Sequence, residues 1–112
     1  MDERRRRAGR NEAVFREVNE RIESLNRGIA ALGDQTMQIV CECGDLLCGE
    51  QFGIAVPAYE RVRSDPACFI VLAGHEDESV EYVVEATDRY NVVRKKPGGA
   101  REVAEETDPR RA

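Results

Sequence analysis

The sequence of 112 residues has no long hydrophobic run. No stretch of about 18 apolar residues is present that would span a bilayer. The N-terminus, with arginines at positions 4–7, also lacks the apolar segment of a secretory signal. From these absences we expect a cytoplasmic protein without a membrane segment.

Motifs of common enzyme chemistry are also missing. The glycine pair in Pro97-Gly98-Gly99 lacks the lysine of a phosphate-binding loop, and we expect no helix after it. His75 is the only histidine, and nothing places it in a Ser-His-Asp arrangement. We therefore expect neither nucleotide binding nor acyl transfer.

The charge of the chain is unevenly distributed. Residues 36–93 carry three arginines against eleven acidic residues, whereas residues 1–10 carry five arginines against two. An acidic body repels a phosphate backbone, so the composition disfavours a nucleic-acid partner.

Against these absences stands a cluster of cysteines. Cys41, Cys43 and Cys48 lie within eight residues, and His75 follows in a Gly-His-Glu-Asp turn. In a reducing cytosol such a cluster predicts a metal site rather than a disulfide framework. Three thiolates and one imidazole match a closed, tetrahedral structural zinc site. The sequence therefore predicts zinc bound by Cys41, Cys43, Cys48 and His75.

Other interpretations of these residues remain open at this stage. Cys68 competes with His75 as fourth ligand, although its apolar surroundings predict a buried small side chain. Without His75 in the shell, an open zinc site with Glu76 as general base would suit a hydrolase. The three clustered cysteines could instead form a reversible disulfide in a thiol-based redox sensor.

A helix is predicted from Asn11 to Leu32, with Asn11 as N-cap and Gly33 at the C-terminal cap. Its apolar positions follow a 3,4 spacing: Phe15, Val18, Ile22, Leu25, Ile29 and Leu32. This narrow stripe favours packing on the domain's own sheet, and a helix-mediated dimer is the alternative.

The remaining elements are predicted to be mostly strands. Alternation predicts one strand over residues 37–43, with Cys41 and Cys43 on one face, and a partner strand over residues 51–56. A short helix over residues 57–63 and a buried strand over residues 68–72 follow, with His75 just beyond the strand. A closing hairpin pairs residues 80–85 with 90–94; the alternative there is a helix over residues 77–86.

Together these patterns predict an α+β fold. The N-terminal amphipathic helix packs on a small, mainly antiparallel sheet of about four or five strands, with one short extra helix. A single zinc-stabilised domain covers residues 11–95, between a disordered arginine-rich tail over residues 1–10 and a disordered charged tail over residues 96–112. A core this small benefits from a metal.

The pattern as a whole resembles a group of small uncharacterised actinobacterial proteins over about residues 11–95. The residues that carry the resemblance are the string Asn11–Ile22, Cys41-Glu42-Cys43-Gly44-Asp45 with Cys48, Tyr59, Val62-Arg63, Asp65-Pro66, Phe69, Gly74-His75-Glu76 and Val83-Val84-Glu85. The resemblance implies that the clustered cysteines and His75 belong to one motif, and it brings no established activity. This chain departs from the group at Ala73, where the others have proline, and at Cys68, where they have another residue.

The function predicted from the sequence is a non-enzymatic zinc-binding module that acts in protein interaction or regulation. Its partner would be another protein, or a second copy met through the N-terminal helix.

Overall fold

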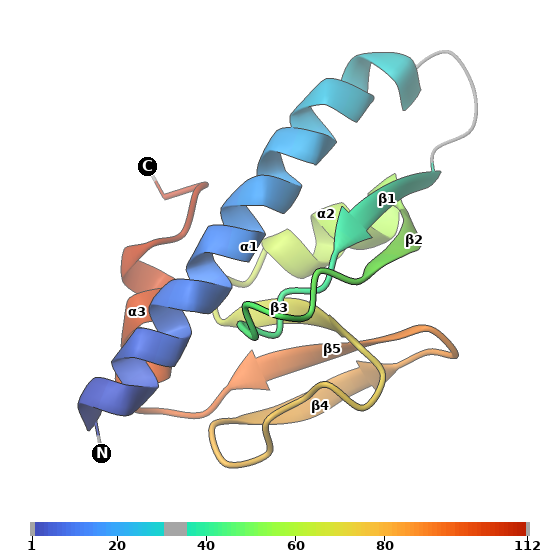
Figure 1. The fold of residues 1–112 in the computed structure, drawn as a ribbon. Helices are drawn as coiled ribbons and strands as arrows, with labels where there is room; N and C mark the ends of the chain where they lie inside the picture. Colours follow the sequence, from blue (N-terminus) through green and yellow to red (C-terminus); the bar gives the residue numbers. More distant parts are fainter. Residues whose placement is uncertain (1, 31–35, 112) are drawn as a thin grey trace.

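The computed structural model describes residues 2–30 and 36–111, with side chains described over 9–26 and 36–111. Within these ranges the chain forms three helices and five strands (Figure 1). In chain order they are α1 (Asp2–Ala30), β1 (Thr36–Val40), β2 (Gln51–Ala55), α2 (Val56–Arg63), β3 (Cys68–Leu72), β4 (Glu81–Ala86), β5 (Tyr90–Lys95) and α3 (Gly99–Glu106). The predicted α+β class is confirmed.

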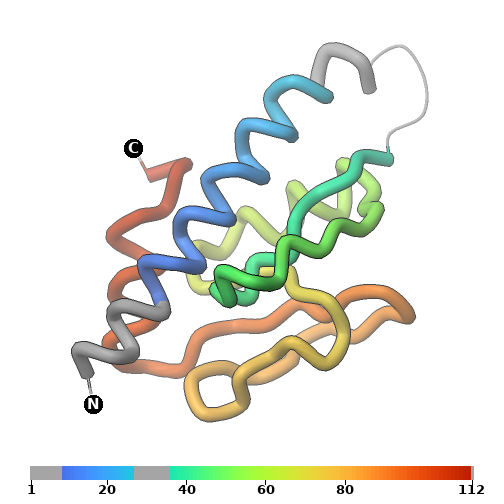
Figure 2. The backbone as a smooth tube through the Cα atoms, in the orientation of Figure 1, coloured from blue at the N-terminus to red at the C-terminus, as the bar shows by residue number. Residues whose placement is uncertain are grey.

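The strands form two antiparallel sheets rather than one. β1 pairs with β2, and the second sheet has the order β3-β5-β4. The predicted hairpin is confirmed as β4 and β5, so the alternative helix over residues 77–86 is wrong. Figure 2 shows the 41–50 connection of the first sheet passing beside β3, where the Glu42 amide donates to the Ile70 carbonyl over 2.9 Å.

Helix α1 begins earlier than the sequence indicated. Its first residue is Asp2, so the prediction of Asn11 as N-cap is wrong, and so is that of a disordered tail over the described residues 2–10. The predicted C-terminal cap at Leu32 and Gly33 lies outside the described residues, as does the side chain of Ile29. Of the helices described, none combines the length and apolarity needed to cross a membrane.

The face that α1 turns toward the domain is polar. Its buried side chains are those of Glu12, Arg16, Asn19 and Glu23, spaced by 4, 3 and 4 residues. The predicted packing of the helix on the domain is confirmed by its contacts with β1, but the apolar stripe faces the domain only in part. Ile22 packs against the hydrophobic core and Phe15 is half-buried, whereas Val18 and Leu25 are exposed.

Unpaired backbone groups explain this choice of face. The Asn19 side chain donates to the Val40 carbonyl and accepts from the Val40 amide, both over 2.8 Å, at the free edge of β1. Arg16 donates to the carbonyls of Pro66 and Ala104, each over 2.7 Å. Buried backbone groups need hydrogen-bond partners, and only polar helix positions supply them.

A buried lysine anchors the first half of α1. The Lys95 ammonium group donates to the carboxylates of Glu12 and Glu81, and all three side chains are buried. Burial raises the pKa of Glu12 from 4.5 to about 7, although the Lys95 charge opposes the shift. The charged form of Glu12 is therefore disfavoured in the folded protein.

The chain ends in a helix that was not predicted. A disordered tail was expected over residues 96–112, and a phosphate loop was rejected partly because no helix would follow Gly99; both expectations are wrong where α3 lies. α3 runs beside the first half of α1 (Figure 1). It buries Ala100, Val103 and Ala104, and a side-chain carbon at Gly9 would lie only 3.2 Å from Val103 Cβ. Gly9 thus permits the close approach of the two helices.

Candidate metal centre

The candidate metal centre begins where β1 leaves its sheet. The Cys41 amide still donates to the Glu50 carbonyl over 2.8 Å, one residue beyond the strand, and holds Cys41 in the core. Gly44, with φ of 83°, then turns the chain. The Cys48 amide donates to the Asp45 carbonyl over 3.0 Å, which closes the turn and brings Cys48 back toward Cys41.

His75 reaches the same place from the other sheet. It follows β3 in a tight turn, where its amide donates to the Leu72 carbonyl over 2.9 Å and Gly74 has φ of 94°. Glu76 closes the turn, because its carboxylate accepts from the Gly74 amide and from the Asn91 side chain, each over 3.0 Å. The histidine is thereby fixed just beyond the end of β3, a buried edge strand of the second sheet.

The four predicted ligands come together. One donor atom from each of Cys41, Cys43, Cys48 and His75 lies within 4.8 Å of all the others. His75 Nδ1 lies 3.7 Å from Cys41 Sγ and 3.5 Å from Cys48 Sγ. A tetrahedral zinc with ordinary bond lengths places a thiolate sulfur about 3.6 Å from an imidazole nitrogen. This donor set, in type and spacing, is close enough to hold a metal ion.

Backbone amides donate hydrogen bonds to two of the sulfurs and so favour their thiolate forms. The Leu72 amide donates to Cys41 Sγ over 3.2 Å, and the Asp45 amide interacts in the same way with Cys43. Burial nonetheless dominates and raises the pKa of both thiols. The thiolate forms therefore require a nearby positive charge, which a bound metal ion would supply.

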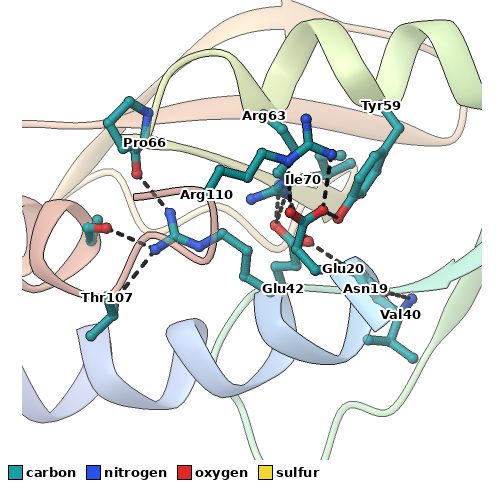
Figure 3. Close-up of polar contacts among 12 residues, drawn as sticks. Asn19, Glu20, Val40, Glu42, Tyr59, Arg63, Pro66, Ile70, Thr107 and Arg110 are labelled. Carbon is teal, nitrogen blue, oxygen red and sulfur yellow. Dashed lines mark hydrogen bonds and ion pairs between the residues drawn. The ribbon is translucent and has the colours of Figure 1, made fainter. Parts of the chain in front are cut away.

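Glu42 fixes the backbone between two of the candidate ligands, a role that was not predicted from the sequence. Its buried carboxylate accepts two hydrogen bonds from Arg63 Nη2, over 2.7 and 2.8 Å, one from Asn19 over 2.6 Å and one from the Ile70 amide over 2.9 Å (Figure 3). The residue between two ligands is thus tied to α1, α2 and β3. The signal that could have revealed it is an acid between two inward-facing cysteines, together with the arginines in the last turn of the short helix that follows.

Cys68, the competing fourth ligand, lies elsewhere. It is buried at the start of β3 in the hydrophobic core and is not part of the four-residue cluster. All four cysteines are free thiols.

Comparisons with protein-family models, with curated proteins and with solved structures gave no match.

Proposed function

We propose that the protein is a non-enzymatic zinc module in which Cys41, Cys43, Cys48 and His75 hold one structural zinc ion. The observation that carries the proposal is the convergence of four donors from two sheets within 4.8 Å of one another. Three soft sulfurs and one imidazole favour zinc over magnesium or calcium, which take oxygen ligands.

The ion would act by tying the two sheets together. Cys41 and Cys43 follow β1, Cys48 precedes β2, and His75 follows β3. Such an arrangement does not exist in the unfolded chain, so the metal's binding free energy becomes folding free energy, on the order of 10 kcal/mol in zinc peptides. The rigid surface that results would serve protein interaction or regulation. Free thiolate ligands persist in a reducing compartment, and we assign the function to the cytoplasm.

Two other functions have less support. A hydrolase with an open zinc site needs a free coordination position and a base. His75 lies close enough to the sulfurs of Cys41 and Cys48 to bind the same ion, and it would then fill that position. The backbone amide of Glu76 itself and the Asn91 side chain lower the pKa of Glu76, which makes it a weak base. A redox sensor needs exposed thiolates of low pKa, whereas burial raises the pKa of Cys41 and Cys43.

Native mass spectrometry of freshly purified, chelator-free protein tests the proposal. We expect one zinc per chain, lost in Cys48→Ser and His75→Ala. Cys68→Ala is the matched control, because it removes a buried thiol outside the cluster and should keep full zinc content. The proposal fails if wild-type protein carries no metal, or if Cys68→Ala loses it as fully as Cys48→Ser does.

Mild peroxide treatment then separates the zinc module from the sensor. A structural centre retains its zinc and its thiol count at oxidant levels that a sensor would detect. A defined disulfide form that releases zinc and is restored by reductant would favour the sensor instead.

A further inference from the structure

The outer face of α1 carries an apolar strip with no partner among the described residues. We define the α1 strip as Val14, Val18 and Leu25, whose exposed fractions are 59%, 39% and 76%. The strip extends for about 17 Å along the helix, at 1.5 Å per residue. The face opposite is held to the domain by polar contacts, so α1 cannot rotate to bury the strip without breaking them. These three exposed apolar side chains share one face of the helix, which makes that face a candidate interaction surface.

A groove borders the strip. It has a volume of about 450 Å³ and is lined by Arg10, Ala13, Val14, Glu17, Val18, Arg21 and Thr107. Arg21 Nε lies 3.9 Å from Glu17 Oε1 on the same helix, and both side chains are largely exposed. The apolar floor is thus flanked by one acid, Glu17, and two bases, Arg10 and Arg21, of which Arg21 lies four residues from Glu17.

This charge pattern is complementary to itself in an antiparallel arrangement. Consider a two-fold axis that crosses α1 between residues 19 and 20. Val14 then lies opposite Leu25 of the second copy, and Val18 lies opposite its Arg21. Glu17 lies within about 1.5 Å, along the axis, of Arg21 of the second copy, and symmetry repeats the pair. Opposite charges that flank an apolar seam select partner and orientation in paired helices.

We propose that the α1 strip is a homodimer contact, in which the α1 helices of two copies pack antiparallel and exchange their Glu17–Arg21 ion pairs. The strip is short, and interfaces below the standard size are weak. We therefore expect a reversible dimer with a dissociation constant on the order of 10 μM.

Analytical ultracentrifugation across 1 μM to 1 mM protein tests the apolar part. We expect a concentration-dependent dimer, and Val18→Asp should weaken it at least tenfold. Val83→Asp is the matched control, because Val83 on β4 is also 39% exposed and lies off α1. This control should change the dissociation constant less than twofold. Circular dichroism verifies that each variant keeps the helical content of the wild type.

Charge exchange tests the orientation. Glu17→Arg and Arg21→Glu should each be monomeric at concentrations where the wild type dimerises. An equimolar mixture of the two should form a heterodimer, since every ion pair across the axis is then complementary. Mixing cannot restore the ion pair within one helix, so this rescue reports only contact between two copies.

Three results would overturn the proposal: a wild-type protein monomeric at 1 mM, equal weakening by Val18→Asp and Val83→Asp, or a mixture no more associated than its components. The Arg21 and Glu17 side chains are 80% and 50% exposed on α1, so the outcome of the charge variants decides the question even where Val18→Asp fails to fold.

Discussion

Removal of the Glu42 carboxylate is the sharpest perturbation of this fold outside the ligands themselves. Glu42 is fully buried and accepts hydrogen bonds from Arg63, Asn19 and the Ile70 amide. Glu42→Ala would leave the Arg63 guanidinium, with its side chain 2% exposed, without a counter-charge. Loss of one partner from a buried ion pair costs about 3–5 kcal/mol. The amide donors left unpaired add to this, so we expect a loss of at least about 4 kcal/mol, a large share of a small domain's stability.

The same change should loosen the metal centre. Glu42 lies between Cys41 and Cys43. Mutation of a residue that orients metal ligands typically lowers the affinity for the metal by about 10- to 100-fold. Denaturant unfolding of the metal-loaded protein measures the stability, and competition with a chromophoric chelator measures the affinity. We expect both to fall in Glu42→Ala, and to fall less in Glu42→Gln, which keeps the volume and one acceptor oxygen.

A double-mutant cycle isolates the ion pair. Arg63→Met and Glu42→Leu should each be strongly destabilising, whereas the double variant should cost at least about 2 kcal/mol less than their sum, because it leaves no buried charge unpaired. A loss of under about 1 kcal/mol in Glu42→Ala, with zinc affinity unchanged, would show that Glu42 stabilises neither the fold nor the metal centre.

Three further perturbations follow from the geometry. The folded pKa of Glu12 is about 7 against 4.5 for the ordinary value, so its charged form destabilises the fold: wild-type stability should fall by about 3 kcal/mol, relative to Glu12→Gln, as pH rises from 4.5 to 7. Measurement of the unfolding free energy of both proteins as a function of pH checks this. A difference between wild type and Glu12→Gln that does not change with pH would contradict it. Gly74→Ala should cost about 1–2 kcal/mol through backbone strain alone, because a Cβ at Gly74 meets nothing within 4 Å; an unchanged melting temperature would contradict this. Chelator treatment should reduce amide protection in hydrogen exchange throughout the domain, because it removes folding free energy on the order of 10 kcal/mol, and protection that the chelator leaves unchanged would count against the zinc tie.

The elements that hydrophobic patterns describe were predictable. β2, β3 and the β4–β5 hairpin follow from period-two alternation or a continuous apolar run, and the pairing of the first two strands was also correct. The convergence of the cysteine cluster with His75 was predicted because the chain has few cysteines and a single histidine, so few combinations of sulfur and imidazole ligands are possible. Local spacing and residue chemistry sufficed for these features.

The docking of α1 was not predictable in this way. Hydrophobic periodicity assigns the apolar stripe to the core, but here the inward positions are Glu12, Arg16, Asn19 and Glu23. Their partners are distant in sequence, such as the Val40 backbone and Lys95, so no local pattern reveals them. The 4,3,4 spacing of these polar residues places them on one helix face, but it does not by itself indicate burial.

Helix α3 was missed for a different reason. Pro97, the glycine pair and the charged end predicted a disordered tail, although Ala100, Val103 and Ala104 have the spacing of one helix face. Small apolar residues give a weak periodic signal, yet they allow the close contact that α3 makes with α1 at Gly9.

X-ray absorption at the zinc edge, on protein purified without chelator and never heated, decides whether Cys41, Cys43, Cys48 and His75 hold the ion. We expect one zinc per chain with three sulfur ligands at about 2.3 Å and one nitrogen ligand at about 2.0 Å. Four sulfur ligands would assign the fourth position to Cys68 instead of His75, and a spectrum of oxygen ligands or a sample without transition metal would contradict the zinc centre itself.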